Sequence, residues 1–254
     1  MVMKQGLPIE STGAMVTQVK TSEAVARRIV GDIVTGRLRP GDRLAGEAVM
    51  IEHYGVSRES FREGLRLLEA QGMLTMKRGP GGGPIIHSVD PANLGRISTL
   101  YFHLAGGTYR ELIEAWVMAE SALACRAASH PDDEIRRRTM EPYRSPDSVA
   151  RTDQQTFVSH HASFHGAVAT LAQNSVLQIW LQTMGLIISR HVVDLENLTS
   201  LHNVIATDHL RIADAIADGQ HTRAAESMEQ HILGIGRHLD GELLGSLDDH
   251  IQWK

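Results

Sequence analysis

The sequence predicts a mainly α fold in two parts: an N-terminal winged helix-turn-helix with a small β-hairpin wing, followed by an all-α antiparallel helical bundle. The first part is predicted by residues 36–84, which contain a turn, two helical segments in close succession and a glycine-rich hairpin. The second part is predicted by the segment beyond residue 90, where apolar residues recur with a helical period and no sustained period-two alternation occurs.

We expect five regions along the 254 residues. They are a flexible N-terminal tail at 1–20, the winged helix-turn-helix domain at 21–87, a linker at 88–93, the helical domain at 94–243 and a C-terminal tail at 244–254. The linker is placed at Asp90-Pro91 because the residue before a proline is pushed out of helical geometry.

The winged domain is predicted to begin with an amphipathic helix over 21–35, where apolar residues recur every fourth position. A short apolar helix over 47–53 follows and suits a supporting role. Gly55 then supplies a tight turn into the next helix.

The next helix is the predicted recognition helix. Ser57 is a favoured N-cap residue, and Gly72 is expected to end the helix in a left-handed conformation. One face is apolar, while Arg58, Arg62 and Arg66 recur at i, i+4 and i+8 on a neighbouring face. Three guanidinium groups beside an anchored apolar face suit insertion into a major groove, because arginine bonds guanine edges and phosphates.

A hairpin wing is predicted after this helix, with short strands near 73–76 and 85–87. The residues expected to contact DNA at its tip are Lys77, Arg78, Gly79 and Gly81. Glycine lets the backbone approach the sugar-phosphate chain closely. The alternative interpretation is that the arginines only form a solvated face and that the winged domain binds protein.

The helical domain is expected to contain seven helices, near 91–104, 108–128, 131–140, 147–172, 175–195, 201–218 and 221–240. The charge is unevenly distributed: residues 20–87 hold 11 Lys and Arg against 8 Asp and Glu, and residues 88–254 hold 13 against 21. The overall charge of −5 therefore combines a basic head with an acidic body, which concentrates the attraction for phosphate at the head.

Cysteine content and hydropathy indicate a soluble cytoplasmic protein. The single Cys125 cannot form an intramolecular disulfide and is interpreted as a packing residue. No apolar run approaches the roughly 20 residues needed to cross a membrane, and no signal segment opens the chain.

Residues 21–87 resemble the DNA-binding domain of the GntR family of bacterial transcription regulators. The resemblance rests on I-V-T-G-R-L-R-P-G-D-R-L, on V-S-R-E-S-F-R-E-G-L-R-L-L-E-A-Q-G and on the R-G-P-G-G-G wing. The remaining part resembles the FadR-type branch, through Phe164-His165, Q-N-S-V-L, Asp208-His209 and M-E-Q-H. The resemblance implies a helical FCD-type domain at 94–243 that binds an effector and dimerises.

Histidines of the helical domain form a candidate metal site. His161 and His165 are four residues apart and therefore share one helix face. The resemblance implies a metal site made by His165, His209, His231 and an aspartate, but His161 occupies the aspartate's position. Four imidazoles favour Zn²⁺, with Ni²⁺ as a further possibility, over Mn²⁺ or Mg²⁺.

That four-histidine interpretation has an alternative, in which His161 faces elsewhere and the site is an ordinary polar pocket. Losing a negatively charged ligand would leave more positive charge on a bound ion, which would strengthen its attraction for an anionic effector. The remaining histidines of the body, including His160 and His202, lack motif support and are interpreted as surface or lightly packed residues.

Trp116 marks a second departure from the family pattern. The resemblance implies an arginine at this position, in an E-x-R-x-x-x-E motif that helps to hold an effector carboxylate, with Glu120 as the closing glutamate. Trp116 instead offers an apolar face and one N–H. We expect Trp116 and Glu120 to line a pocket for a more apolar effector whose carboxylate is held by the metal. The alternative is that Trp116 fills the core.

Together these features predict a sequence-specific DNA-binding regulator that binds a pseudo-palindromic operator as a homodimer. We expect it to act as a repressor. Its operator affinity would be controlled by a small molecule in the metal-containing pocket. A metal-free effector-binding regulator and a metal-dependent hydrolytic enzyme are the alternatives. We expect no enzyme, because no paired carboxylate or nucleophile motif accompanies the histidines.

Overall fold

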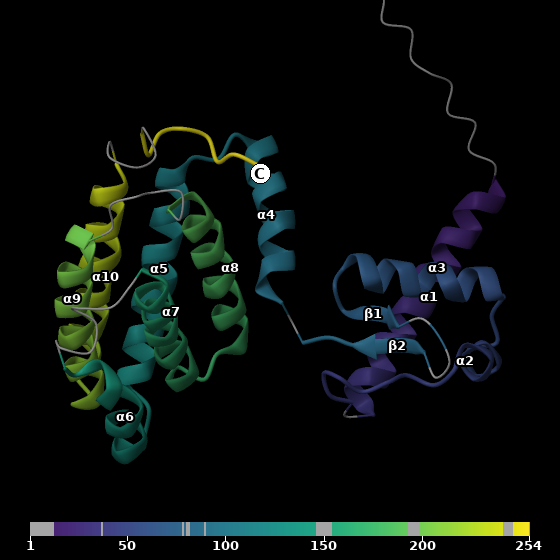
Figure 1. The fold of residues 1–254 in the computed structure, drawn as a ribbon, viewed down its shortest axis with the longest axis horizontal. Coiled ribbons are helices and arrows are strands. Elements are labelled where there is room, and N and C mark those ends of the chain that lie inside the picture. Colours follow the sequence, from purple (N-terminus) through teal and green to yellow (C-terminus); the bar gives the residue numbers. More distant parts are fainter. Residues whose placement is uncertain are drawn as a thin grey trace, which may run out of the picture. The chain divides into compact units, whose positions relative to one another are not determined.

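The fold is described from a computed structural model, in which two compact units divide the chain at residues 93 and 94 (Figure 1). The structure describes residues 13–36, 38–77, 79, 82–88, 90–145, 154–192, 199–240 and 246–253. Among these residues, no helix has the length and apolar character needed to cross a membrane.

The first unit contains three helices and one hairpin among its described residues. They are α1 (Gly13–Thr35), α2 (Glu47–Tyr54), α3 (Arg58–Ala70), β1 (Leu74–Lys77) and β2 (Gly83–Ile86). α1 begins upstream of the expected start at residue 21, within the segment that we interpreted as a tail. The order of elements is that of a winged helix-turn-helix, as predicted.

The core of this unit joins α1 to α3. Phe61 and Leu65 of α3 are buried against Val25 and Ile29 of α1. Gly64 allows the two helices to approach closely, because a Cβ at this position would lie 3.0 Å from both a Val25 methyl carbon and a backbone oxygen of α1. This packing leaves the opposite face of α3 exposed.

Local signals set the ends of α3. The Ser57 hydroxyl oxygen accepts a hydrogen bond of 3.1 Å from the backbone N–H of Ser60, as an N-cap does. Gly55 and Gly72 have φ of 63° and 71°, which are left-handed values that glycine adopts without strain. The predicted turn and the predicted helix end are therefore confirmed.

The wing is a two-stranded antiparallel sheet. Leu74 pairs with Ile86 and Lys77 pairs with Gly83, so the hairpin tip lies just beyond Lys77. An isolated bridge between Arg43 and Ile85 attaches the segment before α2 to this hairpin.

Apart from connecting segments and residues 246–253, the described part of the second unit is helical. Its elements are α4 (Pro91–Ala105), α5 (Tyr109–Ala128), α6 (Asp133–Met140), the 3-10 turn η1 (Glu141–Tyr143), α7 (Gln154–Leu171), α8 (Ser175–Val192), α9 (Thr199–Ala217) and α10 (His221–Leu239). These helices match the predicted ones to within a few residues, except that the predicted start at 147 and the predicted end at 195 lie outside the described residues.

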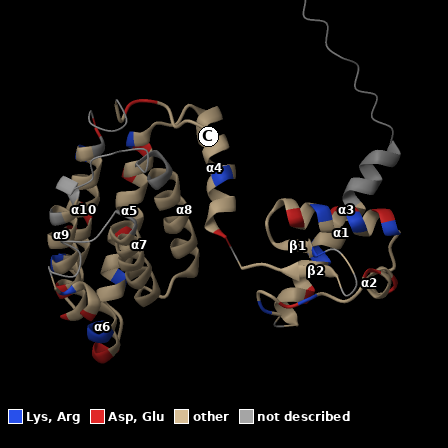
Figure 2. Ribbon diagram, viewed as in Figure 1, with Lys and Arg blue, Asp and Glu red and all other residues tan. Residues whose placement is uncertain are grey.

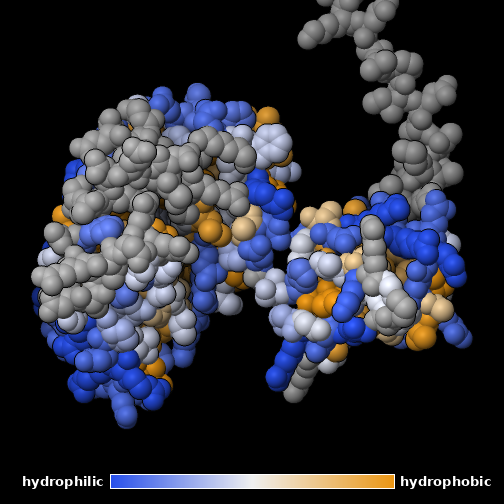
Figure 3. Space-filling view, viewed as in Figure 1, coloured by the Kyte–Doolittle hydropathy of each residue, from blue (hydrophilic) through white to orange (hydrophobic). Residues whose placement is uncertain are grey.

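α5 lies at the centre of the bundle and packs along α10, with α7, α8 and α9 also in contact with it (Figure 1). Gly236 of α10 permits this closeness, because a Cβ there would lie 3.2 Å from Ile113 of α5. Leu123, Phe164 and Ile232 are fully buried in the shared core. The end of the bundle near α6 is hydrophilic (Figure 3), in keeping with the charged sequence of that helix.

Residues 246–253, which we call the C-terminal strap, pack against the junction of α4 and α5 (Figure 1). The backbone N–H of Ile251 donates to Gly107 at 2.9 Å, and that of Arg110 donates to Leu247 at 2.8 Å. Leu247 and Ile251 belong to the bundle core. The strap lies within the predicted C-terminal tail at 244–254, and its two apolar side chains anchor it to the bundle.

Candidate functional site

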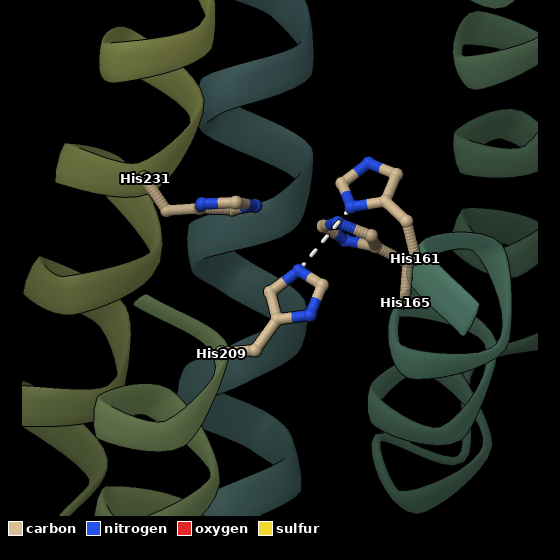
Figure 4. A group of neighbouring side chains, drawn as sticks. All are labelled: His161, His165, His209 and His231. Carbon is tan, nitrogen blue, oxygen red and sulfur yellow. Dashed lines mark hydrogen bonds between the residues drawn. The ribbon is translucent and has the colours of Figure 1, made fainter. Parts of the chain in front are cut away.

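Four histidines from three helices converge inside the bundle (Figure 4). His161 and His165 come from successive turns of α7, His209 comes from α9 and His231 comes from α10. One side-chain nitrogen from each residue can be chosen so that all four nitrogens lie within 4.8 Å of one another. The structure therefore brings together the four residues that the sequence singled out.

His161 faces the other three histidines rather than the outside. Its Nδ1 lies 3.2 Å from Nε2 of His209, and its ring centroid lies 4.5 Å from that of His165 (Figure 4). Because the fourth position of the cluster is thus an imidazole, the cluster offers nitrogen alone.

Packing holds the rings in place. His165, His209 and His231 are buried, and the Phe164 ring stacks on His209 with 3.8 Å between ring centroids. The helical spacing explains this contact, since Phe164 precedes His165 and faces α9 while His165 faces the cluster.

Burial also determines the charge of these rings. It lowers the pKa of His161 and of His209 well below the usual value for an imidazole, and the neighbouring imidazoles lower both further. The pKa of His231 is lowered too, mainly by burial, although its hydrogen bond to Asp208 opposes the shift. These three rings are therefore neutral near pH 7, which is the form that binds a metal.

The unpaired nitrogens fit a metal ion. Nε2 of His165 and Nε2 of His231 are buried and have no hydrogen-bond partner among the described residues, while the nitrogen of His209 that faces the cluster, Nε2, contacts only Nδ1 of His161. Buried polar atoms are normally paired, so the two unpaired nitrogens beside this contact call for a ligand. Imidazole suits Zn²⁺ and Ni²⁺, and the cluster could hold such an ion.

Two carboxylates contact ring nitrogens of the cluster from outside it. Oε1 of Glu120, on α5, lies 2.5 Å from Nδ1 of His165, and Oδ2 of Asp208 lies 3.3 Å from Nδ1 of His231. Carboxylates in this position orient metal-binding imidazoles and raise their basicity. Asp208 was not among the predicted site residues, although it directly precedes His209.

Trp116 lies one turn before Glu120 on the same face of α5. Its indole N–H donates to Oε1 of Glu120 over 3.2 Å, and both side chains are buried. The indole ring also lies near His165, with 6.2 Å between centroids. The two residues expected to line an effector pocket are therefore adjacent to the histidine cluster.

The interpretation of His202 as a surface or lightly packed residue is wrong. The side chain is only 9% exposed, and its ring stacks on Phe157 with 3.8 Å between centroids. Burial lowers its pKa. The spacing of seven residues to His209 placed both on one face of α9, and this was the signal available in the sequence.

The exposed face of α3 carries the predicted DNA-reading arginines (Figure 2). The side chains of Arg58, Arg62 and Arg66 are 69%, 56% and 75% exposed. Glu47 of α2 holds two of them: it accepts hydrogen bonds of 2.9 and 3.3 Å from Arg62 and lies 3.6 Å from Arg58. This role of Glu47 was not predicted.

The wing contributes an exposed Lys77 at the end of β1 and an exposed Gly79 with a φ of 95°. A left-handed φ of this kind explains why glycine occupies the tip. Arg78 and Gly81 lie outside the described residues.

Comparison with known proteins decides the class of the chain. Residues 21–82 match the family described as "Bacterial regulatory proteins, gntR family", and residues 108–234, half of the chain, match the family described as "FCD domain". The chain belongs to the GntR family of transcriptional regulators, in its FCD-containing branch. The predicted resemblance is thereby confirmed, as is the mainly helical fold.

Several curated GntR-type regulators are similar over most of their length. The HTH-type transcriptional regulator YcbG of Bacillus subtilis is 28% identical over 83% of this chain and 86% of its own. The regulator LutR of the same organism is 25% identical over 82% of this chain and 96% of its own. The HTH-type transcriptional repressor NanR of an Enterobacter species is 24% identical over 85% of this chain and 84% of its own.

Among solved structures, a GntR protein of Streptococcus agalactiae has a similar fold. It is 22% identical, and the match covers 85% of this chain and 99% of that one with a TM-score of 0.61. At this identity the likeness supports the fold alone.

Membership of the GntR family makes the chain a DNA-binding transcriptional regulator with an effector-binding FCD domain. Because the family and the relatives are regulators, the prediction that the chain is not an enzyme is confirmed. The hydrolytic alternative for the histidine cluster is therefore set aside.

Proposed function

We propose that this GntR regulator is a repressor that binds a pseudo-palindromic operator as a homodimer and responds to a small molecule in its FCD domain. A single observation supports the proposal most: one chain joins an exposed arginine face on α3 to a buried cluster of four convergent histidines. Two-fold symmetry of the dimer would place two α3 helices on two operator half-sites. Binding to chromosomal DNA would take place in the cytoplasm.

In this proposal Arg58 and Arg62 read base edges in the major groove, and Ser57 fixes the start of the helix at the DNA. Arg66, Lys77 and Arg78 bind phosphates, which adds affinity without sequence information. Gly79 and Gly81 let the wing reach the minor groove. The exposure of the three α3 arginines supports these roles.

The FCD domain would hold a divalent ion, Zn²⁺ or else Ni²⁺, on His161, His165, His209 and His231. When bound, the ion would supply an electrophilic contact for an effector carboxylate. An apolar part of the effector would lie toward the α5 side, where Trp116 and Glu120 lie. Effector binding would then change the relative placement of the two DNA-binding heads and release the operator.

The DNA-binding part is tested by selecting duplexes from a random library with the purified protein. The wild type should enrich a two-fold symmetric sequence, and Arg62→Ala should bind that sequence about 10- to 100-fold more weakly, as the loss of one bidentate base contact implies. Arg223→Ala, an exposed arginine of α10, is the matched control. Unchanged specific affinity in Arg62→Ala would contradict the assigned role.

The effector part is tested with metal-loaded protein, metal-free protein and His209→Ala in a thermal-shift screen of small carboxylic acids. An effector of the proposed kind stabilises the loaded wild type alone and weakens its binding to the selected duplex. If a ligand stabilises all three forms equally, the protein is a metal-free effector-binding regulator.

A further inference from the structure

Glu120 is a fully buried carboxylate, and its ion-pair contact among the described residues is with the imidazole of His165. Among the residues that the structure describes, no lysine or arginine lies within ion-pair distance of it, and its Oε2 has no hydrogen-bond partner. A buried carboxylate is strongly unfavourable unless it is paired with a positive charge. Glu120 therefore favours positive charge beside it, on the His165 imidazole or on a bound cation.

The neighbours of Glu120 indicate where that charge lies. Its Oε1 is 2.5 Å from Nδ1 of His165, in close contact although not aligned as a hydrogen bond. The other ring nitrogen of His165, Nε2, is buried and unpaired in the described part of the structure. The carboxylate thus lies on one side of the imidazole, and the histidine cluster lies on the other.

Trp116 holds the Glu120 carboxylate in place through a hydrogen bond. Trp116 and Glu120 are one helical turn apart on α5, and the indole N–H donates to the same Oε1 that touches His165. The indole carries no charge, so it orients Glu120 without neutralising it.

We propose that Trp116 and Glu120 are positioning residues for a metal ion, acting through His165. Through its contact at Oε1, Glu120 favours the tautomer of His165 with the proton on Nδ1, which leaves Nε2 free for the ion, and it places a carboxylate beside a ligand set of four imidazoles. Trp116 holds Glu120 in that position. This inference rests on the proposed metal pocket and gives both residues a role other than direct contact with an effector.

The test is zinc affinity, measured by competition with a chromophoric chelator on metal-free protein. Glu120→Gln keeps the size of the side chain and its acceptor oxygen but removes the charge, and it should bind zinc about 10- to 100-fold more weakly. Glu114→Gln, an exposed glutamate on the same helix, is the matched control and should bind as the wild type does. The unfolding temperature of metal-free Glu120→Gln should not fall, which separates this role from a structural one.

Cobalt substitution separates positioning from direct ligation. With saturating Co²⁺, Glu120→Gln should keep the intensity of its visible absorption bands, since that intensity follows the coordination number. A large intensity change would show that Glu120 is itself a ligand and would overturn the proposal. Zinc affinity equal to that of the wild type would overturn it as well.

A double-mutant cycle tests whether Trp116 affects metal binding only through Glu120, an effect that we call the relay. Trp116→Phe should weaken zinc binding in the wild-type background and cause no further loss in the Glu120→Gln background, because Trp116 acts only through Glu120. Trp180→Phe, a partly exposed tryptophan on α8, is the control. Additive losses would overturn the relay.

Failure of this inference can be told apart from failure of the proposed metal pocket. If the wild type binds zinc and His209→Ala does not, while Glu120→Gln equals the wild type, only the inference fails. If the wild type itself does not bind zinc, the metal pocket and the inference fall together.

Discussion

Glu47 shows how one residue can prepare a DNA-reading surface. It draws Arg62 and Arg58 together through its two carboxylate oxygens, so that their guanidinium groups are partly ordered before DNA arrives. Ordering a side chain in advance lowers the entropic cost of binding. The same negative charge also repels phosphate, which works against non-specific binding.

We predict that Glu47→Gln binds random duplex more tightly and discriminates the operator less well. Removing the charge strengthens the attraction for any phosphate chain, while Arg62 loses part of its fixed orientation. Fluorescence anisotropy with the selected duplex and with a scrambled one measures both effects. Glu63→Gln, which removes the carboxylate paired with Arg66 on the same helix, is the comparison. An unchanged ratio of the two affinities would count against the role of Glu47.

His161 sets the chemical character of the cluster, because it makes the donor set all nitrogen. We predict that His161→Asp shifts the metal preference toward harder ions such as Mn²⁺, since a carboxylate oxygen suits them better than an imidazole nitrogen does. Competition between Zn²⁺ and Mn²⁺, followed by elemental analysis of the protein, measures the change. His160→Asp, at the adjacent position outside the cluster, should leave the preference as it is.

At the scale of elements, the contact of α3 with α1 places the recognition helix. Gly64→Val would put a branched side chain where a Cβ already meets a backbone oxygen and Val25 at 3.0 Å. We expect a loss of about 1–3 kcal/mol in the free energy of unfolding of the first unit. Chemical denaturation measures it, and the matched control is Gly31→Ala, which meets nothing within 4 Å and should gain about 0.5–1 kcal/mol.

The C-terminal strap is a second element with a measurable contribution. Ile251 is 2% exposed, so Ile251→Ala should lower the stability of the helical unit by about 2–5 kcal/mol. Trp253, three-fifths exposed on the same strap, provides a control, because Trp253→Ala removes a larger side chain with little buried area. Equal losses for the two variants would mean that the strap does not anchor the bundle through Ile251.

Local signals explain how much could be predicted. Ser57 and Gly72 mark the ends of α3, and the four-residue spacing of His161 and His165 places both on one face of α7, since these features depend only on neighbours in sequence. The contact of Glu120 with His165 could not be predicted, because it depends on how α5 packs against α7.

The same limit applies to the strap. Its short, polar sequence gives no periodic signal, and its anchoring depends on backbone partners at Gly107 and Arg110 that lie far away along the chain. Patterns in a sequence report faces of elements, whereas these contacts are set by the assembled bundle.

At the scale of the whole molecule, the buried cluster makes stability depend on pH. The pKa values of His161, His209 and His231 are lowered in the folded state, whereas an unfolded imidazole titrates near about 6.5. Below that pH the unfolded chain binds protons that the folded chain does not. The free energy of unfolding therefore keeps its full value above about pH 6.5, and it decreases as the pH falls toward the lowered pKa values of the folded state.

We predict that the metal-free protein unfolds at progressively lower denaturant concentration as the pH falls from 7.5 to about 5.5. His209→Ala should flatten this dependence, while His221→Ala, an exposed histidine, should preserve it. A midpoint in the wild type that does not change with pH would contradict the prediction.

The C-terminal strap also has a consequence for how the bundle folds. Ring nitrogens of His103 and His250 contact backbone carbonyls 148 and 144 positions away along the chain, at Ile251 and Gly106. Joining such distant segments closes a large loop, and contacts of this kind form late and slow the folding rate. The corner between α4 and α5 would then be the last part of the bundle to become native. A fusion partner attached just after the strap would act on that final step, whereas one attached before α1 would not.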